Sequence, residues 1–403
     1  MNRMDLPEPL VSIVIPTRNR HEYLKILIDV VLSGFGEEVQ LVVHDNSDRA
    51  GGLDECRKKW ASDPRFLYVH DPAPMSITEN FERSVALATG QYVCMLGDDD
   101  GVTPSVVPLA RWMQLNNVDA AVTPVPTYLW PGVDSKLDGS RHNGILRLRR
   151  YTSKIRMLTS KVSLDEVLAD GATSLGTLPS VYQGVVARSA LDRLAKETGS
   201  VFPGASPDMA NAIGLSAVVD EFAYVSFPIV ISGVCPRSAA AEGASHSHQG
   251  EVADRDFLEK SAAEKWPAEV PHYFSGPTLY AATVVAALQQ TRRAELIGTI
   301  RWHRLYAACN VLTPDYRDRV TKFREAHSKK MSNMVVRLAE AQIWLRRGTH
   351  LLLNLTKRVT RGHVVNLPDI ADAVQYIESR YGLFDPYLAV GKSGRNSRAG
   401  LPA

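Results

Sequence analysis

Long apolar runs, paired cysteines and a strong excess of one charge are all missing from this sequence. No apolar run approaches the ~18 residues that a helix needs to span a bilayer. The four cysteines (Cys56, Cys94, Cys235 and Cys309) lie far apart and form no C-x-x-C pair, which disfavours a zinc ribbon or a disulfide framework and fits a reducing cytosol. The net charge of +2 does not indicate nucleic acid as a partner.

Three common nucleotide and metal motifs are also absent. No G-x-G-x-x-G follows the first predicted strand, which disfavours a dinucleotide-binding unit. The end of a Walker A loop is suggested by Gly391-Lys392-Ser393, but Pro386 stands where the first glycine belongs. No H-E-x-x-H motif occurs, which disfavours a zinc metalloprotease helix.

Three consecutive acids follow a short apolar run. Residues 92–96 (Tyr-Val-Cys-Met-Leu) show no polar alternation, which predicts a strand covered on both faces. Asp98, Asp99 and Asp100 would then stand where this strand leaves the sheet, the edge at which open α/β sheets bind ligands. Neighbouring carboxylates repel each other unless they share a cation, and Mg²⁺ or Mn²⁺ carrying a phosphate suits oxygen ligands. The alternative is a solvated acidic turn.

The chain up to about residue 235 alternates between strand and helix patterns. Strands are predicted at 11–15, where Pro16 should end the strand, and at 39–43, 65–69, 118–123, 181–186 and 227–231. Helices lie between them, one with Leu24, Leu27, Ile28 and Val31 on one face and one opened by the capping box Ser76–Glu79. This alternation predicts a mostly parallel sheet with helices on both faces, while residues 127–150 are expected to be irregular.

Helical patterns replace strand patterns after residue 256. Helices are predicted at 280–290, 294–311, 316–329, 332–346 and 369–381. Residues 337–361 combine six arginines and lysines with Trp344 and several leucines against a single acid, Glu340. This composition suggests contact with a membrane surface or with an anionic, lipid-linked acceptor. Packing against the rest of the chain, or against a second subunit, is the alternative.

Four segments together resemble family 2 glycosyltransferases of the GT-A fold. They are residues 11–20 (VSIVIPTRNR), the Asp45-Asn46-Ser47 turn, the Ala88-Thr89-Gly90 helix end and residues 96–100 (LGDDD). The resemblance covers roughly residues 10–235, with the segments in the family's order and spacing. One departure is Gly97, which stands where the family's D-x-D region usually has an acid.

The resemblance implies an inverting transfer from a nucleoside-diphosphate sugar, with Mn²⁺ or Mg²⁺ as cofactor. It implies Asp99 and Asp100 as metal ligands, with the roles of Asp98 and Asp100 open to exchange. A histidine after the core, His248 or His246, would complete the metal site. The nucleotide-sugar contacts that it implies are Pro16, Thr17, Arg18, Arg20, Asp45, Asn46, Asn80 and Asp98. The simple alternatives are an Asx-turn at Asp45 and a solvated loop for the arginines and for the two histidines.

Asp208 is the candidate catalytic base. In the segment Ser206-Pro207-Asp208, serine suits the N-cap and proline the first helical position. The helix dipole alone could account for an acid there. Inverting transfer, however, needs a carboxylate to take the proton of the acceptor hydroxyl, and the family places this acid about a hundred residues after D-x-D. Asp165 and Glu166 are weaker candidates.

These observations predict an α/β protein of GT-A type. Residues 1–250 would be the catalytic domain, 251–390 a helical module and 391–403 a flexible tail. We expect a cytoplasmic glycosyltransferase, with peripheral contact at the inner face of the membrane left open. It would act on a glycan or lipid-linked acceptor in surface polysaccharide biosynthesis. The alternatives are a sugar-phosphate nucleotidyltransferase, which should have a glycine-rich loop where residues 16–20 stand, and an inactive glycan-binding relative.

Overall fold

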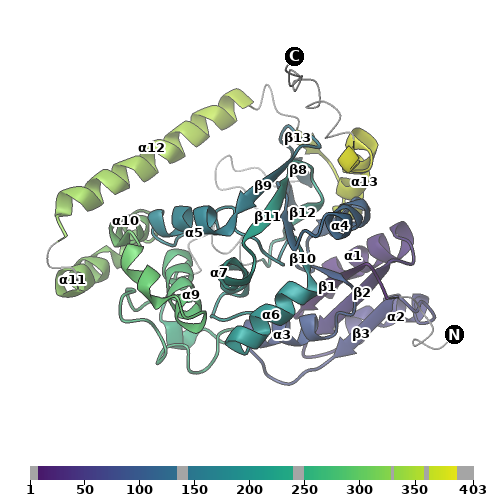
Figure 1. The fold of residues 1–403 in the computed structure, drawn as a ribbon, viewed down its shortest axis with the longest axis horizontal. Helices are drawn as coiled ribbons and strands as arrows, with labels where there is room; N and C mark the ends of the chain where they lie inside the picture. Colours follow the sequence, from purple (N-terminus) through teal and green to yellow (C-terminus); the bar gives the residue numbers. More distant parts are fainter. Residues whose placement is uncertain (1–7, 134–143, 239–248, 328–330, 358–362, 388–403) are drawn as a thin grey trace, which may run out of the picture.

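Two β-sheets and a group of helices make up the protein (Figure 1). The computed structural model describes residues 8–133, 144–238, 249–327, 331–357 and 363–387. Within these residues the larger sheet has eight strands in the order β3-β2-β1-β4-β10-β6-β11-β9. The strands are β1 Val11–Thr17, β2 Val39–Asp45, β3 Phe66–His70, β4 Tyr92–Met95, β6 Ala120–Val122, β9 Ile155–Thr159, β10 Val185–Ala187 and β11 Glu221–Val225.

The first half of this sheet is parallel, and the predicted α/β fold is confirmed. β1 pairs in parallel with β2 and β4, and β2 pairs in parallel with β3. β10 runs antiparallel to both β4 and β6, while β9 runs antiparallel to β11. The polar ends of β1, β2 and β4 therefore meet at one edge, where Asp45 and the three acids stand.

The expectation that Pro16 ends the first strand is wrong. β1 continues to Thr17, with Pro16 opposite His44 of β2. Its pairing with β4 ends earlier, at Val14 and Met95. Beyond that point β1 has a ladder partner on one side only, and proline is tolerated at such edge positions because its missing N–H breaks no ladder hydrogen bond.

The second sheet contains strands that the sequence patterns did not reveal. Its order is β13-β8-β7-β12-β5 within the described residues, with β5 Gly101–Val102, β7 Thr127–Leu129, β8 Ile145–Arg147, β12 Val230–Val234 and β13 His363–Val365. The supposedly irregular region 127–150 thus supplies two strands, and a strand follows residue 256 after all. Strands of two or three residues are too short to show a two-residue period, which explains why β5, β7, β8 and β13 were missed.

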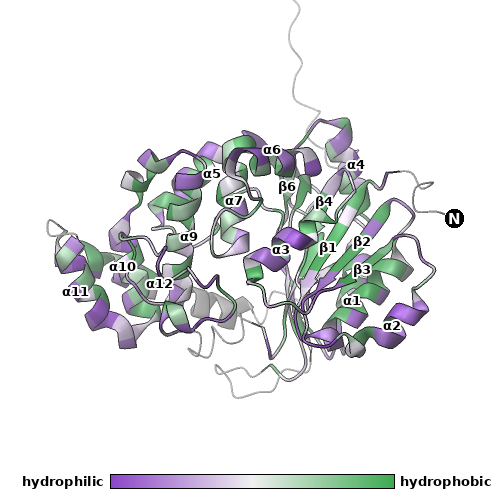
Figure 2. Ribbon diagram, turned by 90° about the horizontal axis from the view of Figure 1, so that it is seen from below, coloured by the Kyte–Doolittle hydropathy of each residue, from purple (hydrophilic) through white to green (hydrophobic). Residues whose placement is uncertain are grey.

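The helices of the first half cover the larger sheet. They are α1 His21–Gly34, α2 Asp54–Lys59, α3 Ile77–Ala86, α4 Val106–Leu115, α5 Ser160–Ala169, α6 Arg188–Thr198 and α7 Pro207–Val218. The predicted apolar face of α1 is buried in a core shared with the sheet, α4 and α6. Figure 2 shows the hydrophobic strands β1, β2 and β4 between α4 and α1. Ser76 caps α3 as predicted, by accepting from the Glu79 amide.

The later helices form a second core and then return to the sheets. They are α9 Gly276–Gln290, α10 Trp302–Leu312, α11 Arg317–His327, α12 Asn333–Lys357 and α13 Ile370–Tyr381. A second apolar cluster joins α5 and α7 to α9, α10 and α12, whereas α13 packs on the smaller sheet. The single helix expected over 294–311 is wrong, because extended backbone at Ile300 separates a 3-10 helix (Ala294–Thr299) from α10.

No helix in the described part of the chain is long and apolar enough to cross a membrane. The predicted division at residue 250 stays a prediction. The contacts of α9 with α7, and of β13 and α13 with the smaller sheet, show that residues after 250 are packed closely onto the preceding ones.

Gly233 of β12 holds the acidic segment against the smaller sheet. Its amide donates to Asp100 Oδ1 at 2.8 Å, and a Cβ at this position would lie 1.7 Å from the Asp99 carbonyl oxygen. We predict that Gly233→Ala lowers the free energy of unfolding by about 1–3 kcal/mol, because the backbone on both sides must move. Urea denaturation followed by circular dichroism measures this loss.

Gly34→Ala provides the matched control, since a Cβ there meets nothing within 4 Å. It should leave stability unchanged or slightly raised, because alanine restricts the unfolded chain. Equal denaturation midpoints for the two variants would contradict the close packing at Gly233.

Candidate active site

Asp98 lies at the centre of a buried polar cluster where β1 and β4 end. All three acids of the 98–100 segment are buried. The Thr17 hydroxyl at the end of β1 donates to Asp98 Oδ2 at 2.6 Å, and Arg20 Nε donates to the same oxygen at 3.1 Å. The parallel pairing of β1 with β4 therefore brings the residues 16–20 loop onto the acids, as expected from the strand order.

Arg20 is placed between two of the three carboxylates. Its Nη2 lies 2.8 Å from Asp98 Oδ1, and its Nη1 lies 3.7 Å from Asp99 Oδ2. Burial lowers the pKa of Arg20, but the charges of Asp98 and Asp99 outweigh burial and raise it. The Nη2 contact with Asp98 Oδ1 is an ion pair by distance, yet its geometry is not that of a hydrogen bond, so this oxygen keeps unused acceptor capacity within the described residues.

Asp100 is bound differently from its two neighbours. Its Oδ1 accepts from the Gly233 amide, and its Oδ2 accepts from the Gly97 amide at 2.8 Å and from Gln183 Nε2 at 3.0 Å. Gln183 has a positive φ of 58°, a conformation that costs a non-glycine residue free energy. Both Asp100 oxygens thus anchor the acidic turn to β12 and to the 181–183 segment. This geometry favours Asp98 and Asp99 over Asp100 as the acids facing a ligand.

Burial makes ionisation of the cluster costly. It raises the pKa of Asp98 to about 7, an effect that Arg20 opposes and Asp99 reinforces. It also raises the pKa of Asp100 to about 7, again with a contribution from the charge of Asp99. A carboxylate transferred from water into such a site favours its neutral form unless a cation compensates. A further cation bound at this cluster would therefore favour the ionised form of its carboxylates.

Gly97, where the resembled family usually has an acid, has no room for a larger side chain. A Cβ there would lie 3.1 Å from the Tyr182 hydroxyl, 3.2 Å from Asp99 Oδ1 and 3.3 Å from Asp100 Oδ2. An acid at this position would have to displace Tyr182 and repel two carboxylates. The side chains around position 97 therefore suit glycine, the residue at which this chain differs from the resembled family.

Asp45 forms an Asx-turn, which was the alternative to a contact with the nucleotide. It is buried, and its carboxylate accepts from the Ser47 amide at 2.9 Å and from the Tyr68 hydroxyl at 2.7 Å, with His21 Nε2 at 2.8 Å. Burial alone would raise the pKa of Asp45, but the hydrogen bonds from Ser47 and Tyr68 outweigh it and lower the pKa. Asp45 thus shapes the loop after β2.

The other residues assigned to the nucleotide sugar fall into two groups. Asn46 donates to the Asp71 and Ala73 carbonyls, and Asn80 contacts His44 and the Thr17 carbonyl, so both support the loops from within. Arg18 is half exposed and lies near Asp48. The structure brings Thr17, Arg20 and Asp98 together and leaves Arg18 at the rim.

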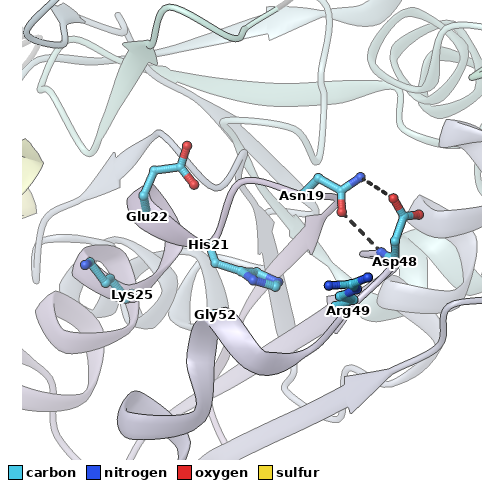
Figure 3. Close-up of a pocket in the computed structure, with 7 residues that line it drawn as sticks. All are labelled: Asn19, His21, Glu22, Lys25, Asp48, Arg49 and Gly52. Carbon is cyan, nitrogen blue, oxygen red and sulfur yellow. Dashed lines mark hydrogen bonds between the residues drawn. The ribbon is translucent and has the colours of Figure 1, made fainter.

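A surface pocket of about 740 Å³ opens beside the residues 16–20 loop. It is lined by Asn19, His21, Glu22, Lys25, Asp48, Arg49 and Gly52. Figure 3 shows Asn19 and Asp48 joined across one side of it, with Lys25 and His21 on the α1 side. The three acids and Asp208 do not line this pocket, so we assign the chemistry to the acidic cluster instead.

Asp208 lies at the beginning of α7, as predicted. Ser206 stands at the N-cap and Pro207 at the first helical position, as predicted, but the serine makes no capping hydrogen bond to the backbone. Its hydroxyl instead donates to Asp208 Oδ1 at 2.5 Å. The Met209 amide donates to the same oxygen at 2.8 Å, and the Tyr280 hydroxyl of α9 donates to Oδ2 at 3.0 Å. These donors hold the partly buried carboxylate in one orientation.

Tyr182 is partly buried beside Gly97 of the acidic turn and was missed by sequence reasoning. Burial raises the pKa of Tyr182 well above its ordinary value, and the charges of Asp100, Asp99 and Asp208 raise it further. The charges of both the acidic cluster and the candidate base therefore keep this phenol protonated. Tyr280 was missed as well, since it belongs to a helix outside the recognised motifs, and no local pattern marks either tyrosine.

The remaining candidates lie elsewhere. Asp165 and Glu166 are exposed on α5. His246 and His248 fall outside the described residues. Among the residues that are described, no group of three or more His, Cys, Asp and Glu side chains is arranged to hold a metal ion by itself.

Comparison with known proteins places this site in a family context. Residues 12–165 match the model of glycosyl transferase family 2. The abequosyltransferase RfbV of Salmonella typhimurium (strain LT2) is 31% identical over 97 residues, 23% of this chain and 29% of that protein. WcaA of Escherichia coli (strain K12), which carries the name of a colanic acid biosynthesis glycosyl transferase, is 26% identical over 106 residues, 24% of this chain and 35% of that protein.

The chain thus spans only about a third of each curated relative that it matches. A structure of S. aureus TarS 1-349 in complex with UDP-GlcNAc aligns over 84% of this chain and 92% of that chain, with a TM-score of 0.45 and 12% identity. The matched residues 12–165 run from β1 to α5 and include Arg20 and the three acids. The likeness to glycosyl transferase family 2 is therefore carried by this segment of the chain.

Proposed function

We propose that this protein is an inverting glycosyltransferase. It moves a sugar from a nucleoside-diphosphate sugar to a hydroxyl group of a glycan or lipid-linked acceptor. The observation that carries the proposal is the grouping of Asp98, Asp99 and Arg20 at the ends of β1 and β4, together with a separate carboxylate, Asp208, that Ser206 and Tyr280 hold at the start of α7. One set of groups suits the diphosphate and the other suits the acceptor hydroxyl.

The acids fit a divalent metal that is shared with the donor. Asp98 Oδ1 is buried with unused acceptor capacity, and Asp99 and Asp98 point to the same guanidinium. Mg²⁺ and Mn²⁺ take oxygen ligands, and Mg²⁺ is commonly held by one or two carboxylates together with substrate phosphates. A site completed by the donor agrees with the lack of a third protein ligand among the described residues. Bound there, the metal would stabilise the negative charge of the leaving diphosphate.

Asp208 serves as the general base in this proposal. The bond between the anomeric carbon and the diphosphate oxygen breaks as the acceptor oxygen bonds to the opposite face of that carbon, and the acceptor proton passes to Asp208. Ser206 and Tyr280 orient the carboxylate, and a base must lie within hydrogen-bond reach of the proton that it takes. Arg20 supplies a fixed positive charge next to the diphosphate.

The names of the two relatives described above support a biological setting for this proposal. Both are named as sugar transferases, one of them in colanic acid biosynthesis, which supports a role in making a surface polysaccharide. The sugar and the acceptor are left to experiment. The residue roles rest on the chain's own geometry, since the sequence matches are local.

The raised pKa of Asp98 predicts a specific pH dependence of stability. Because the folded-state pKa of about 7 exceeds that of an ordinary aspartate, the folded protein binds an extra proton between about pH 4 and pH 7. Stability from this group is therefore present at low pH and is lost as the pH rises through that window. Asp98→Asn cannot ionise at this position. Its free energy of unfolding, relative to that of the wild type, should therefore rise by about 1 kcal/mol or more from pH 5 to pH 8.

Urea titrations of both proteins in EDTA at several pH values measure this relative gain. Comparing the change between pH values removes any constant effect of the substitution on the contacts with Thr17 and Arg20. Unfolding free energies that stay parallel from pH 5 to pH 8 would contradict the buried charge at Asp98.

The role of Asp208 predicts that binding and transfer can be separated. Asp208→Asn should reduce transfer by about 10²–10⁴-fold, because the acceptor proton loses its base. Donor affinity should change little, since the substituted group faces the acceptor. Calorimetric titration of the donor alongside a transfer assay gives both quantities.

Asp165→Asn is the matched control, because it removes an exposed carboxylate on α5. This variant should transfer sugar at the wild-type rate. If Asp208→Asn transfers normally, or loses donor binding along with transfer, Asp208 is not the base.

A further inference from the structure

Helix α12 has apolar residues on two opposite faces. On one face Val336 and Ala339 are buried and Ile343 packs beside them, in the apolar cluster shared with α10. On the other face Met334, Leu338 and Leu345 are 66%, 57% and 69% exposed. The first face accounts for the attachment of α12 to the protein, whereas the side chains of the second face are mostly exposed.

The exposed residues form one continuous stripe. Steps of four and seven residues, from Met334 to Leu338 and from Leu338 to Leu345, keep side chains on the same side of an α-helix. Ala341 falls between them on this side by the same spacing. Figure 1 shows α12 at the margin of the molecule, with no other labelled element beyond it. The stripe therefore faces away from the protein.

The charges next to this stripe have one sign. Arg337 and Arg347 are exposed, and the Arg347 guanidinium lies 5.3 Å from the centre of the Trp344 ring. Arg346 is exposed as well, but it is paired with Asp170, next to the end of α5, at 3.6 Å. The only acid between residues 333 and 349 is Glu340. Its carboxylate is turned inward, accepting from Asn310 Nδ2 at 2.7 Å and lying 3.5 Å from Arg317. By helical spacing, Arg337 and Trp344 border the apolar stripe, and the outward side carries no acid.

We propose that the outward face of α12 docks on an anionic lipid surface. A helix with an apolar stripe, flanking arginines and an exposed tryptophan can lie in the interface, with the stripe at the acyl boundary and the guanidinium groups on lipid phosphates. A second copy of the chain is a poorer occupant. Pairing two such faces would bring arginines together with no outward acid to balance them.

This docking requires no catalytic activity, so it stands independently of the proposed transfer reaction. The experiment is flotation of the full chain with vesicles of phosphatidylcholine, with and without phosphatidylglycerol. The wild type should float with the anionic vesicles and remain unbound with the neutral ones. Added salt should weaken the binding, because it screens the arginines.

The test variant is Leu338→Gln combined with Leu345→Gln, which keeps every charge and leaves the buried face of α12 intact. It should bind anionic vesicles roughly tenfold more weakly, because the apolar stripe is lost. Leu115→Gln is the matched control, since Leu115 is 63% exposed on α4, and it should bind like the wild type. A second variant, Arg337→Gln with Arg347→Gln, should lose the salt dependence.

Three outcomes would overturn the proposal. In the first, the wild type fails to float with anionic vesicles. In the second, the leucine variant floats as well as the Leu115→Gln control. In the third, the wild type has the mass of a dimer in solution and the leucine variant has the mass of a monomer. The last outcome would assign the stripe to contact between two copies of the chain. Light scattering after size exclusion measures that mass.

Discussion

The burial of three adjacent carboxylates next to one arginine is the constraint on which this structure depends. Carboxylates removed from water are costly unless they are paired and hydrogen-bonded. Arg20 and Thr17 compensate Asp98, while Gly97, Gly233 and Gln183 compensate Asp100. These donors come from the end of β1, from β12 and from the segment before β10. The hydrogen bonds of the acids therefore join the larger sheet to β12 of the smaller sheet, at the edge where ligands are expected.

The three acids differ in the contacts that they make. Asp100 uses both oxygens for internal contacts, so it keeps the turn in place. Asp98 and Asp99 share one guanidinium, and Asp98 Oδ1 is buried with no hydrogen-bond partner among the described residues. Asp208 is held separately, by a serine of its own helix start and by a tyrosine of α9. Residues after 250 thus contribute directly to the geometry of the candidate base.

Much of this arrangement could be predicted from the sequence, because it depends on local patterns. The strand before the acids, the face of α1, the cap of α3 and the position of Asp208 all follow from periodicity and capping chemistry. The parallel pairing of β1 and β4 then explains why Arg20 meets Asp98. The end of β1 was misjudged because a ladder that stops on one side tolerates Pro16.

The parts that could not be predicted depend on contacts between distant segments. The short strands β5, β7, β8 and β13 are stabilised by their partners in the second sheet and carry no period of their own. Tyr182 and Tyr280 reach the site through tertiary packing, and Asp100 became an anchor because Gly233 approaches it from β12. The motif pointed to Asp99 and Asp100 as metal ligands, with the roles of Asp98 and Asp100 open to exchange, whereas the hydrogen-bond partners mark Asp100 as an anchor of the turn.

Calorimetric titration of nucleoside diphosphates with Mn²⁺, into the wild type and into Asp99→Asn, tests the central claim most directly. The account predicts that at least one nucleoside diphosphate binds the wild type in a metal-dependent manner and that Asp99→Asn loses the metal-dependent part. If no nucleoside diphosphate binds with Mn²⁺ or Mg²⁺, or if Asp99→Asn binds as the wild type does, the acids do not form a metal–diphosphate site.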